Sequence, residues 1–226
     1  RDDASVLHGG GSVGTFREML VFAQEEHRGA RIIIKAHPDT VAGHRQGYFD
    51  ETHTSEQITL LTDPVSPYAL LEGAVAVYTV SSGMGFEAII AGHKPIVFGQ
   101  PFYAGWGLTD DRQPIDRRQR KLTRTQLFAG AMLDYPSWYD PYRDELCPLE
   151  QVIDTLEAQT KVFRQDQTGY TALSMKPWKR AHLQKFFGSV TPLIFSEVPK
   201  PDRKTLIWGS KHYDFPAIRI EDGFLR

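Results

Sequence analysis

The stretch from Tyr78 to Gly107 contains the residues best suited to chemistry. Ser81, Ser82 and Gly83 follow an apolar run and open a short helical pattern, and Glu87 lies one turn into that pattern. A helix N-terminus offers free backbone N–H groups to an anion, and two hydroxyls stand beside them here. Glu87 would repel a phosphate but can accept hydrogen bonds from ribose hydroxyls. We interpret the stretch as a nucleotide site, more narrowly a nucleotide-sugar site; the alternatives are simple N-caps and a solvated first-turn carboxylate.

A second candidate group follows an earlier β-branched run, 31–35, which ends in Lys35-Ala-His37-Pro38-Asp39. Pro38 disfavours helical geometry at His37 and holds the imidazole at a strand end, where sheets of parallel strands bind ligands. A histidine there can donate to a phosphate or protonate a leaving phosphate. The alternative is a turn histidine bonded to the backbone, and the serine pair two strands later favours the functional interpretation.

Acidic pairs stand near both ends of the sequence. Asp2 and Asp3 precede a triple glycine, 9–11, whose backbone can come close to a ligand. A carboxylate near an anomeric carbon can act as a nucleophile or stabilise an oxocarbenium-like transition state, although spacing alone favours a surface turn. Glu221 and Asp222 end a strand-like run, where a general base for an acceptor hydroxyl would also lie.

Composition excludes several classes of function. The chain has 226 residues, 41% hydrophobic and 24% charged, with a net charge of -2, so nucleic acid is not an expected partner. Cys147 is the single cysteine, which excludes an intrachain disulfide framework. Metal-ligand spacings and a phosphate-binding G-x-x-x-x-G-K-[ST] loop are absent from the sequence, and no apolar run is long enough for a membrane span. We expect no metal and no cofactor.

Apolar runs alternate with amphipathic stretches in the first 135 residues, which predicts an α/β fold with a parallel sheet and helices on both faces. The expected strands are 31–35, 58–61, 74–79 and 95–98, and the expected helices are 15–26, 67–73 and 85–91. The polar run 112–124 reads as a solvated charged face, with attraction to anionic lipid or glycan as the alternative.

The remaining sequence predicts two helices, a linker and a second unit. The helices are 125–133 and 148–163, separated by a proline-broken aromatic loop at 135–142. We expect the second helix to bury a stripe formed by Leu149, Val152, Ile153, Leu156 and Gln159. Residues 165–177 read as a linker, and 178–226 as the start of another α/β unit with a basic aromatic helix at 178–187 and strands at 193–195, 205–208 and 217–220. Core packing is the favoured role of that helix, and a membrane surface is the alternative.

Together these motifs resemble the bacterial capsular polysaccharide β-Kdo transferases of the KpsC type. The resembling strings cover nearly the whole chain, and two of them are specific: Pro101-Phe-Tyr-Ala-Gly-Trp-Gly-Leu-Thr109 and Arg219-Ile-Glu-Asp-Gly-Phe-Leu-Arg226. The others are Arg1-Asp-Asp-Ala-Ser5, Lys35-Ala-His-Pro-Asp39, Ser81-Ser-Gly-Met-Gly-Phe-Glu-Ala88, Trp178-Lys-Arg180 and Trp208-Gly209.

The resemblance implies tandem glycosyltransferase modules of a GT-B-like fold. It implies transfer of Kdo from CMP-Kdo, with retention, onto an oligo-Kdo linker on a phosphatidylglycerol-type lipid in capsular polysaccharide biosynthesis and transport. The motif order then assigns 1–164 to the nucleotide-sugar half of one module and 178–226 to the acceptor-side start of the next, an excised segment inactive alone. It also implies a cytoplasmic protein, with peripheral contact with the inner face of the inner membrane and with capsule assembly proteins as a further expectation.

The resemblance also implies roles for individual residues. Asp3, with Asp2 as the less favoured candidate, resembles the nucleophile, and Glu221 resembles the acceptor base with Asp222 in support. His37 would contact the CMP phosphate, the serines would bind it and Glu87 would hold the ribose. The implied substrate-binding set is Lys35, His37, Pro38, Ser81, Ser82, Gly83 and Glu87.

Two other interpretations remain open at this point. One is a GT-B glycosyltransferase or epimerase that uses a UDP- or GDP-sugar. The other is a non-catalytic module of a capsule assembly complex that keeps the fold without turnover.

Overall fold

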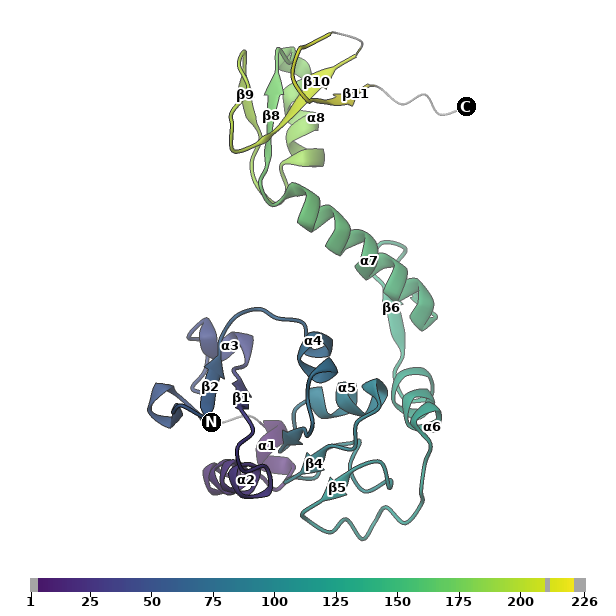
Figure 1. The fold of residues 1–226 in the computed structure, drawn as a ribbon. Helices are drawn as coiled ribbons and strands as arrows, with labels where there is room; N and C mark the ends of the chain where they lie inside the picture. Colours follow the sequence, from purple (N-terminus) through teal and green to yellow (C-terminus); the bar gives the residue numbers. More distant parts are fainter. Residues whose placement is uncertain (1–3, 210–211, 222–226) are drawn as a thin grey trace. The chain divides into compact units, whose positions relative to one another are not determined.

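The computed structural model describes residues 4–209 and 212–221 (Figure 1). The chain forms two compact units, Arg1–Pro136 and Ser137–Arg226. Each unit is described by itself.

Two helices of the first unit begin at residues that favour a helix N-terminus. Ser12 and Thr15 form a reciprocal capping box that starts α2 (Val13–Glu26), and Pro67 opens α4 (Pro67–Glu72), which ends at Gly73. Both helices were predicted. The other helical segments before residue 92 are α1 (Ala4–His8), α3 (Pro38–Val41), η1 (Glu51–His53) and α5 (Met84–Ala91).

The strands of the first unit are parallel, as predicted, but they form two sheets rather than one. β1 (Ile32–Lys35) pairs with β2 (Ile58–Leu61). β3 (Tyr78–Thr79), β4 (Ile96–Val97) and β5 (Asp110–Asp111) form a second sheet in that order. The predicted strand at 74–79 is limited to its last two residues, and the strand at 31–35 is not fully buried, since Ile33 is 49% exposed.

The core of the first unit packs between α5, β4 and the chain that follows them. Its buried residues are Ile89, Val97, Tyr103, Ala104 and Leu127. The predicted helix at 125–133 is present as α6 (Arg124–Phe128), which continues into the π-helical segment η2 (Ala129–Asp134). The polar run 112–124 is not simply a solvated face, because Arg112 forms an ion pair with Glu26 and Arg118 donates to backbone carbonyls.

The second unit opens with an antiparallel hairpin where a loop was expected. β6 (Trp138–Asp140) pairs with β7 (Glu145–Cys147). The Asp140 carboxylate accepts hydrogen bonds from the Tyr142 N–H and from the Gln151 side chain. These bonds, the Tyr142 N–H first, hold the pKa of Asp140 below its ordinary value. The hairpin is thereby tied to α7 (Leu149–Asp166), which carries Gln151.

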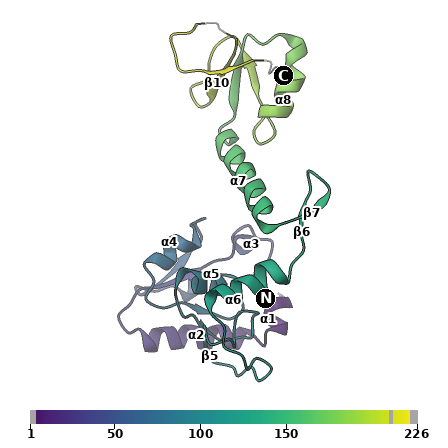
Figure 2. The ribbon, with the colours of Figure 1, turned by 90° about the vertical axis from the view of Figure 1, so that its right-hand side faces the viewer.

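The second unit contains a four-stranded parallel sheet in the order β11-β10-β8-β9. Its strands are β8 (Tyr170–Leu173), β9 (Ile194–Ser196), β10 (Lys204–Trp208) and β11 (Ile218–Ile220). α8 (Pro177–Phe187) lies along one face of the sheet and packs Leu183 against it (Figure 1, Figure 2). The expected α/β character is present, although the sheet includes β8, which precedes the expected start at residue 178.

The stretch 165–177 is not a linker. It contains β8, a central strand whose four residues are all buried. The polar residues on either side of Tyr170–Leu173 concealed a strand too short for a strong periodic signal. The chain divides instead between Pro136 and Ser137.

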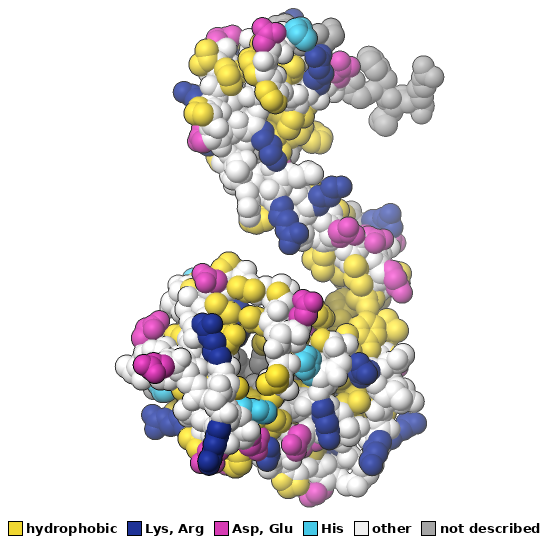
Figure 3. All heavy atoms as spheres, in the orientation of Figure 1, with side chains coloured by type: hydrophobic (Ala, Val, Ile, Leu, Met, Phe, Trp, Pro, Cys, Tyr) yellow, Lys and Arg dark blue, Asp and Glu magenta, His cyan; other side chains and the backbone are white. Residues whose placement is uncertain are grey.

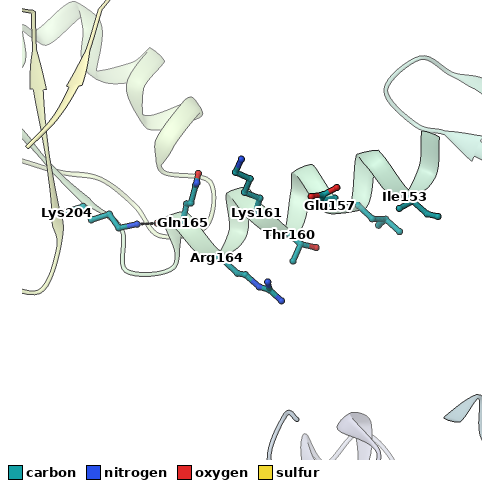
Figure 4. Close-up of a pocket in the computed structure, with 8 residues that line it drawn as sticks. Ile153, Glu157, Thr160, Lys161, Arg164, Gln165 and Lys204 are labelled. Atoms are coloured by element: carbon teal, nitrogen blue, oxygen red, sulfur yellow. Dashed lines mark hydrogen bonds between the residues drawn. The ribbon is translucent and has the colours of Figure 1, made fainter. Parts of the chain in front are cut away.

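The predicted inner stripe of α7 is mostly exposed. Leu149 is buried, but Ile153 is 52% and Leu156 is 54% exposed. Figure 4 shows Ile153 on the α7 surface that continues through Glu157 and Lys161 toward Lys204. On α8, Trp178 and Phe186 are also exposed. Among the described residues, no helix combines the length and the apolar character that a bilayer span requires.

Candidate functional site

The turn after β3 presents polar groups that lack partners. Within the described part of the chain, the Ser81 hydroxyl and the N–H groups of Ser81 and Gly83 have no hydrogen-bond partner. Ser82 differs, because its hydroxyl accepts a hydrogen bond from the Met84 N–H over 3.3 Å. Ser82 thus serves the helix start, while Ser81 and Gly83 keep donors at the N-terminus of α5, where the helix dipole favours an anion.

Two buried side chains hold the backbone of Ser82 in place. The Ser82 N–H donates to the Thr79 hydroxyl over 3.2 Å, and the Tyr103 hydroxyl donates to the Ser82 carbonyl over 2.6 Å. Thr79 and Tyr103 are both buried. Motif reasoning did not assign a role to either residue, although Tyr103 lies in one of the two specific strings.

The string 101–109 folds into a compact loop beneath this turn. The Arg118 guanidinium donates to the carbonyls of Pro101 and Ala104, each over 2.6 Å. The Asp111 carboxylate accepts from the Gly105 N–H over 3.0 Å and from the Thr109 hydroxyl over 2.8 Å. These bonds satisfy the backbone polar groups of an irregular segment that packs into the core. This requirement explains why the string 101–109 needs particular residues at particular positions.

The glycine run 9–11 lies against the same turn. The Gln100 N–H donates to the Gly9 carbonyl over 2.7 Å, and a Cβ added at Gly9 would lie 3.6 Å from the Cβ of Ser81. A Cβ at Gly11 would come within 2.7 Å of a Val80 methyl. The missing side chains therefore permit close packing against protein rather than against a ligand. α1 is brought beside the Ser81 turn, whereas Asp2 and Asp3 lie outside the described residues.

The His37 side chain contacts residues of the segment that directly follows it. Its Nδ1 accepts from the Asp39 N–H over 3.1 Å, and the Arg45 guanidinium lies 3.0 Å from Nδ1 and from Nε2. Arg45 also donates to the Asp39 carboxylate over 2.8 Å. This is the backbone-bonded turn histidine of the alternative interpretation, with Pro38 at the first position of α3. Arg45 is a cationic neighbour that motif reasoning missed.

The Lys35 ammonium also has a partner within the first unit, since it donates a hydrogen bond to the Asp63 carbonyl over 2.9 Å.

Figure 3 shows that the first unit is hollowed on the face drawn, between the segments that Figure 1 labels β1, α4 and α5. β1 ends directly before His37, and α5 begins directly after the serine turn. No described hydrogen bond or ion pair joins His37 to Ser81.

The carboxylates of the predicted site are placed unequally. Glu87 lies in the first turn of α5 and is half-buried, and burial raises its pKa. Glu221 is exposed at the end of β11 in the second unit, and Asp222 lies outside the described residues. In the parts of the chain that the structure describes, no group of three or more His, Cys, Asp or Glu side chains is arranged to hold a metal ion.

Comparisons with known proteins identify the family of the chain. The sequence profile of the capsule polysaccharide biosynthesis protein family matches residues 1–137. The capsule polysaccharide modification protein LipA of Neisseria meningitidis serogroup B is 34% identical over 99% of this chain. The lipopolysaccharide-processing protein LpsZ of Rhizobium meliloti is 41% identical over 61% of it. The chain spans only 35% and 31% of the length of these two relatives.

Two solved structures from Thermosulfurimonas dismutans are similar to the chain. The KpsC beta Kdo 2,4 transferase superposes with a TM-score of 0.66 at 40% identity, over 69% of this chain and 48% of that structure. The KpsC beta Kdo 2,7 transferase superposes with a TM-score of 0.53 at 32% identity, over 63% and 45%. Since the family profile matches more than half of its residues, including the whole Ser81 turn, this chain belongs to the capsule polysaccharide biosynthesis protein family.

Proposed function

We propose that the chain is part of a glycosyltransferase that transfers Kdo from CMP-Kdo, with retention, onto an oligo-Kdo linker on a phosphatidylglycerol-type lipid. The observation that carries the proposal is the Ser81–Gly83 turn. It combines donors that have no partner among residues 4–209 and 212–221 with support from the buried Thr79 and Tyr103 side chains. The likeness to two structures named as Kdo transferases, at 40% and 32% identity, supports this sugar.

In this proposal the turn binds the phosphate of the nucleotide. The Ser81 hydroxyl and the N–H groups of Ser81 and Gly83 donate to phosphate oxygens, and the N-terminus of α5 adds its partial positive charge. These donors also stabilise the negative charge that develops as CMP leaves, because they are held in position before the reaction. The buried bonds from Thr79 and Tyr103 support this preorganisation.

Glu87 would accept hydrogen bonds from the ribose hydroxyls. It lies in the first turn of α5, close to the phosphate site in sequence, and it is half-buried. His37, Lys35 and Pro38 would face the nucleotide from the end of β1. For His37 to contact the phosphate, its imidazole would exchange its present bond with the Asp39 N–H or use its other nitrogen, and Arg45 beside it would add positive charge.

Retention requires two displacements at the anomeric carbon. In the first, a carboxylate oxygen of Asp3, or of Asp2, bonds to that carbon as the bond to the phosphate oxygen breaks and CMP leaves with the electron pair. In the second, an acceptor hydroxyl loses its proton to a base, bonds to the carbon and releases the carboxylate. α1 begins at Ala4, directly after these acids in the sequence, and the glycine run that follows it lies beside the Ser81 turn, which supports this assignment.

Each unit would belong to a different GT-B-like module. The first unit would supply the nucleotide half of one active site, and the second unit would open the acceptor half of another, with Glu221 as its base and Asp222 in support. The parallel sheet of the second unit and the position of Glu221 directly after β11 support this division.

The test is a transferase assay on the full-length protein that carries this chain, with CMP-Kdo and a Kdo-bearing glycolipid acceptor. We expect turnover with CMP-Kdo, inhibition by CMP and no inhibition by UDP or GDP. Mass spectrometry of an enzyme incubated with donor alone should find a Kdo adduct on Asp3. Turnover with a UDP- or GDP-sugar instead, or no turnover with any sugar nucleotide, would contradict the proposal.

A further inference from the structure

We propose that Tyr103 is a positioning residue of the donor site, which acts by fixing the carbonyl of Ser82 and thereby the direction of the donors at Ser81 and Gly83. This inference rests on the proposed function of the Ser81 turn. Tyr103 does not touch the nucleotide in this account, since its side chain is fully buried below the turn.

The hydroxyl of Tyr103 is a strong and permanent donor. It donates to the Ser82 carbonyl over 2.6 Å. Burial raises the pKa of Tyr103 to about 12, so the hydroxyl keeps its proton across the physiological range. The same carbonyl accepts the Gly85 N–H over 3.0 Å, so the Tyr103 hydroxyl is its second donor. Two donors from different directions restrain where the Ser82 carbonyl can point.

A second bond fixes the other side of the same residue. The Ser82 N–H donates to the Thr79 hydroxyl over 3.2 Å, and the Thr79 side chain is itself buried. Both polar groups of the Ser82 backbone are therefore held by a buried pair of hydroxyls. The residues on either side, Ser81 and Gly83, are the ones whose donors remain without partners in the described chain.

The position of the Tyr103 ring is set from two directions. A Cβ added at Gly85 would lie 2.3 Å from the Tyr103 oxygen, so the ring occupies the space that any other residue would fill. On the far side, the two bonds from Arg118 to the carbonyls of Pro101 and Ala104 fix the backbone around it. The ring cannot shift without disturbing α5 or the 101–109 loop, so its hydroxyl is a fixed reference point for the turn.

The test compares the affinity of the full-length protein for CMP, by calorimetry, in Tyr103→Phe and in a matched control, Tyr170→Phe. Phenylalanine keeps the ring and removes only the hydroxyl. Tyr170 has the same chemistry in the second unit, since its buried hydroxyl donates to the Asp166 carboxylate. We expect Tyr103→Phe to weaken CMP binding about three- to tenfold, which corresponds to the net contribution of roughly one hydrogen bond. Tyr170→Phe should leave the affinity unchanged.

A thermodynamic cycle with Ser81→Ala separates positioning from general stability. If Tyr103 acts through the turn, adding Tyr103→Phe to Ser81→Ala should weaken CMP binding by less than it does in the wild type. Fully additive effects would overturn the inference. Thr79→Val, which removes the other bond to Ser82, should reproduce the loss of affinity and serves if Tyr103→Phe fails to fold.

The outcomes distinguish this inference from the proposed function. Wild-type affinity in Tyr103→Phe and Thr79→Val, with CMP binding lost in Ser81→Ala, would overturn the role of Tyr103 and leave the phosphate site intact. Absence of CMP binding by the wild-type protein would overturn both. Equal loss of affinity in Tyr103→Phe and Tyr170→Phe would show a global effect on stability and would also overturn the positioning role.

Discussion

At the scale of single residues, Ser81 and Ser82 are neighbours with different partners. The Ser82 hydroxyl accepts the Met84 N–H at the start of α5, whereas the Ser81 hydroxyl has no hydrogen-bond partner among the described residues. The pair therefore divides the two roles that the sequence left open. The Ser82 hydroxyl supports the first residue of α5, whose N-cap is Gly83, and the Ser81 hydroxyl is available to a ligand.

This division predicts opposite effects of two single substitutions. Ser82→Ala should lower the free energy of unfolding by roughly 1 kcal/mol, because the Met84 N–H in the first turn of α5 loses its acceptor. Ser81→Ala should leave stability within about 0.5 kcal/mol of the wild type, since no internal bond is lost, and should weaken CMP binding more than Ser82→Ala does. Chemical denaturation and calorimetry on the same preparations measure both quantities. A larger loss of stability in Ser81→Ala would contradict the assignment.

The proposed role of Glu87 predicts that the protein binds a ribonucleotide more tightly than the corresponding deoxyribonucleotide. If its carboxylate binds ribose hydroxyls, the wild-type protein should prefer CMP to 2′-deoxy-CMP by about tenfold, as a site with unpaired buried acceptors does. Glu87→Ala should reduce that preference to near unity while binding of the deoxynucleotide changes little. Glu72, at the end of α4, offers a control in Glu72→Ala, which should keep the preference. A preference that survives Glu87→Ala would remove the ribose role.

Residue types revealed the serine turn but not what holds it. Ser-Ser-Gly before a helical pattern is a local signal, so it was readable in the sequence. The bonds from Thr79 and Tyr103 join residues 3 and 21 positions from Ser82, and only the fold brings the second pair together. His37 shows the reverse case, because a local backbone bond that its proline neighbour favours is what the structure contains.

At the scale of elements, α5 can pack closely against the 101–109 loop because Gly85 has no side chain. Gly85→Ala should lower the free energy of unfolding by about 1–3 kcal/mol, because the new methyl group would overlap the Tyr103 ring. Gly130→Ala is the matched control, since nothing lies within 4 Å of its added Cβ. Thermal denaturation of the two variants measures the difference. Equal stability would show that the ring has room to move.

A network of three side chains ties α2 to the sheet that β3, β4 and β5 form. The Glu26 carboxylate accepts hydrogen bonds from the Tyr78 hydroxyl and from the Arg112 guanidinium. These bonds, that of Tyr78 first, hold the pKa of Glu26 below its ordinary value of 4.5. The charged carboxylate therefore stabilises the folded state above that pH, and the contribution is lost as the pH falls through the lowered pKa.

Replacement of this carboxylate predicts a specific pH dependence. At pH 7, Glu26→Gln should lower the free energy of unfolding by roughly 1 kcal/mol, a modest figure because solvent screens a partly exposed group. The gap between variant and wild type should close as the pH falls from 4.5 through the lowered pKa, at which the native carboxylate becomes protonated. Urea titrations at a series of pH values measure it. A gap that does not change with pH would contradict the role of the charge.

Helices were easier to predict than strands at this scale. The periodic stretches at 15–26 and 178–187 became α2 and α8 because each has an apolar face and a clear start. β5 and the β6–β7 hairpin were missed, since two- and three-residue strands rich in Asp, Tyr and Glu have no apolar alternation to detect. Their pairing depends on neighbours that are distant in sequence or on a turn that Asp140 stabilises.

At the scale of the whole molecule, the boundary between the units coincides with the limit of the family profile. The first unit ends at Pro136, and the profile ends at residue 137. The second unit lies within the longer match to LipA, which covers 99% of the chain. The family profile thus covers the unit that carries the Ser81 turn.

The affinities of the full-length protein for CMP and for cytidine test the phosphate site most directly. The two ligands share base and ribose and differ only in the phosphate. We expect the wild-type protein to bind CMP at least about tenfold more tightly than cytidine, because charge-assisted bonds to phosphate are strong. In Ser81→Ala combined with Ser82→Ala, that advantage should shrink severalfold while cytidine affinity stays constant. A CMP advantage that is undiminished in the double variant would contradict the claim that the turn holds the phosphate.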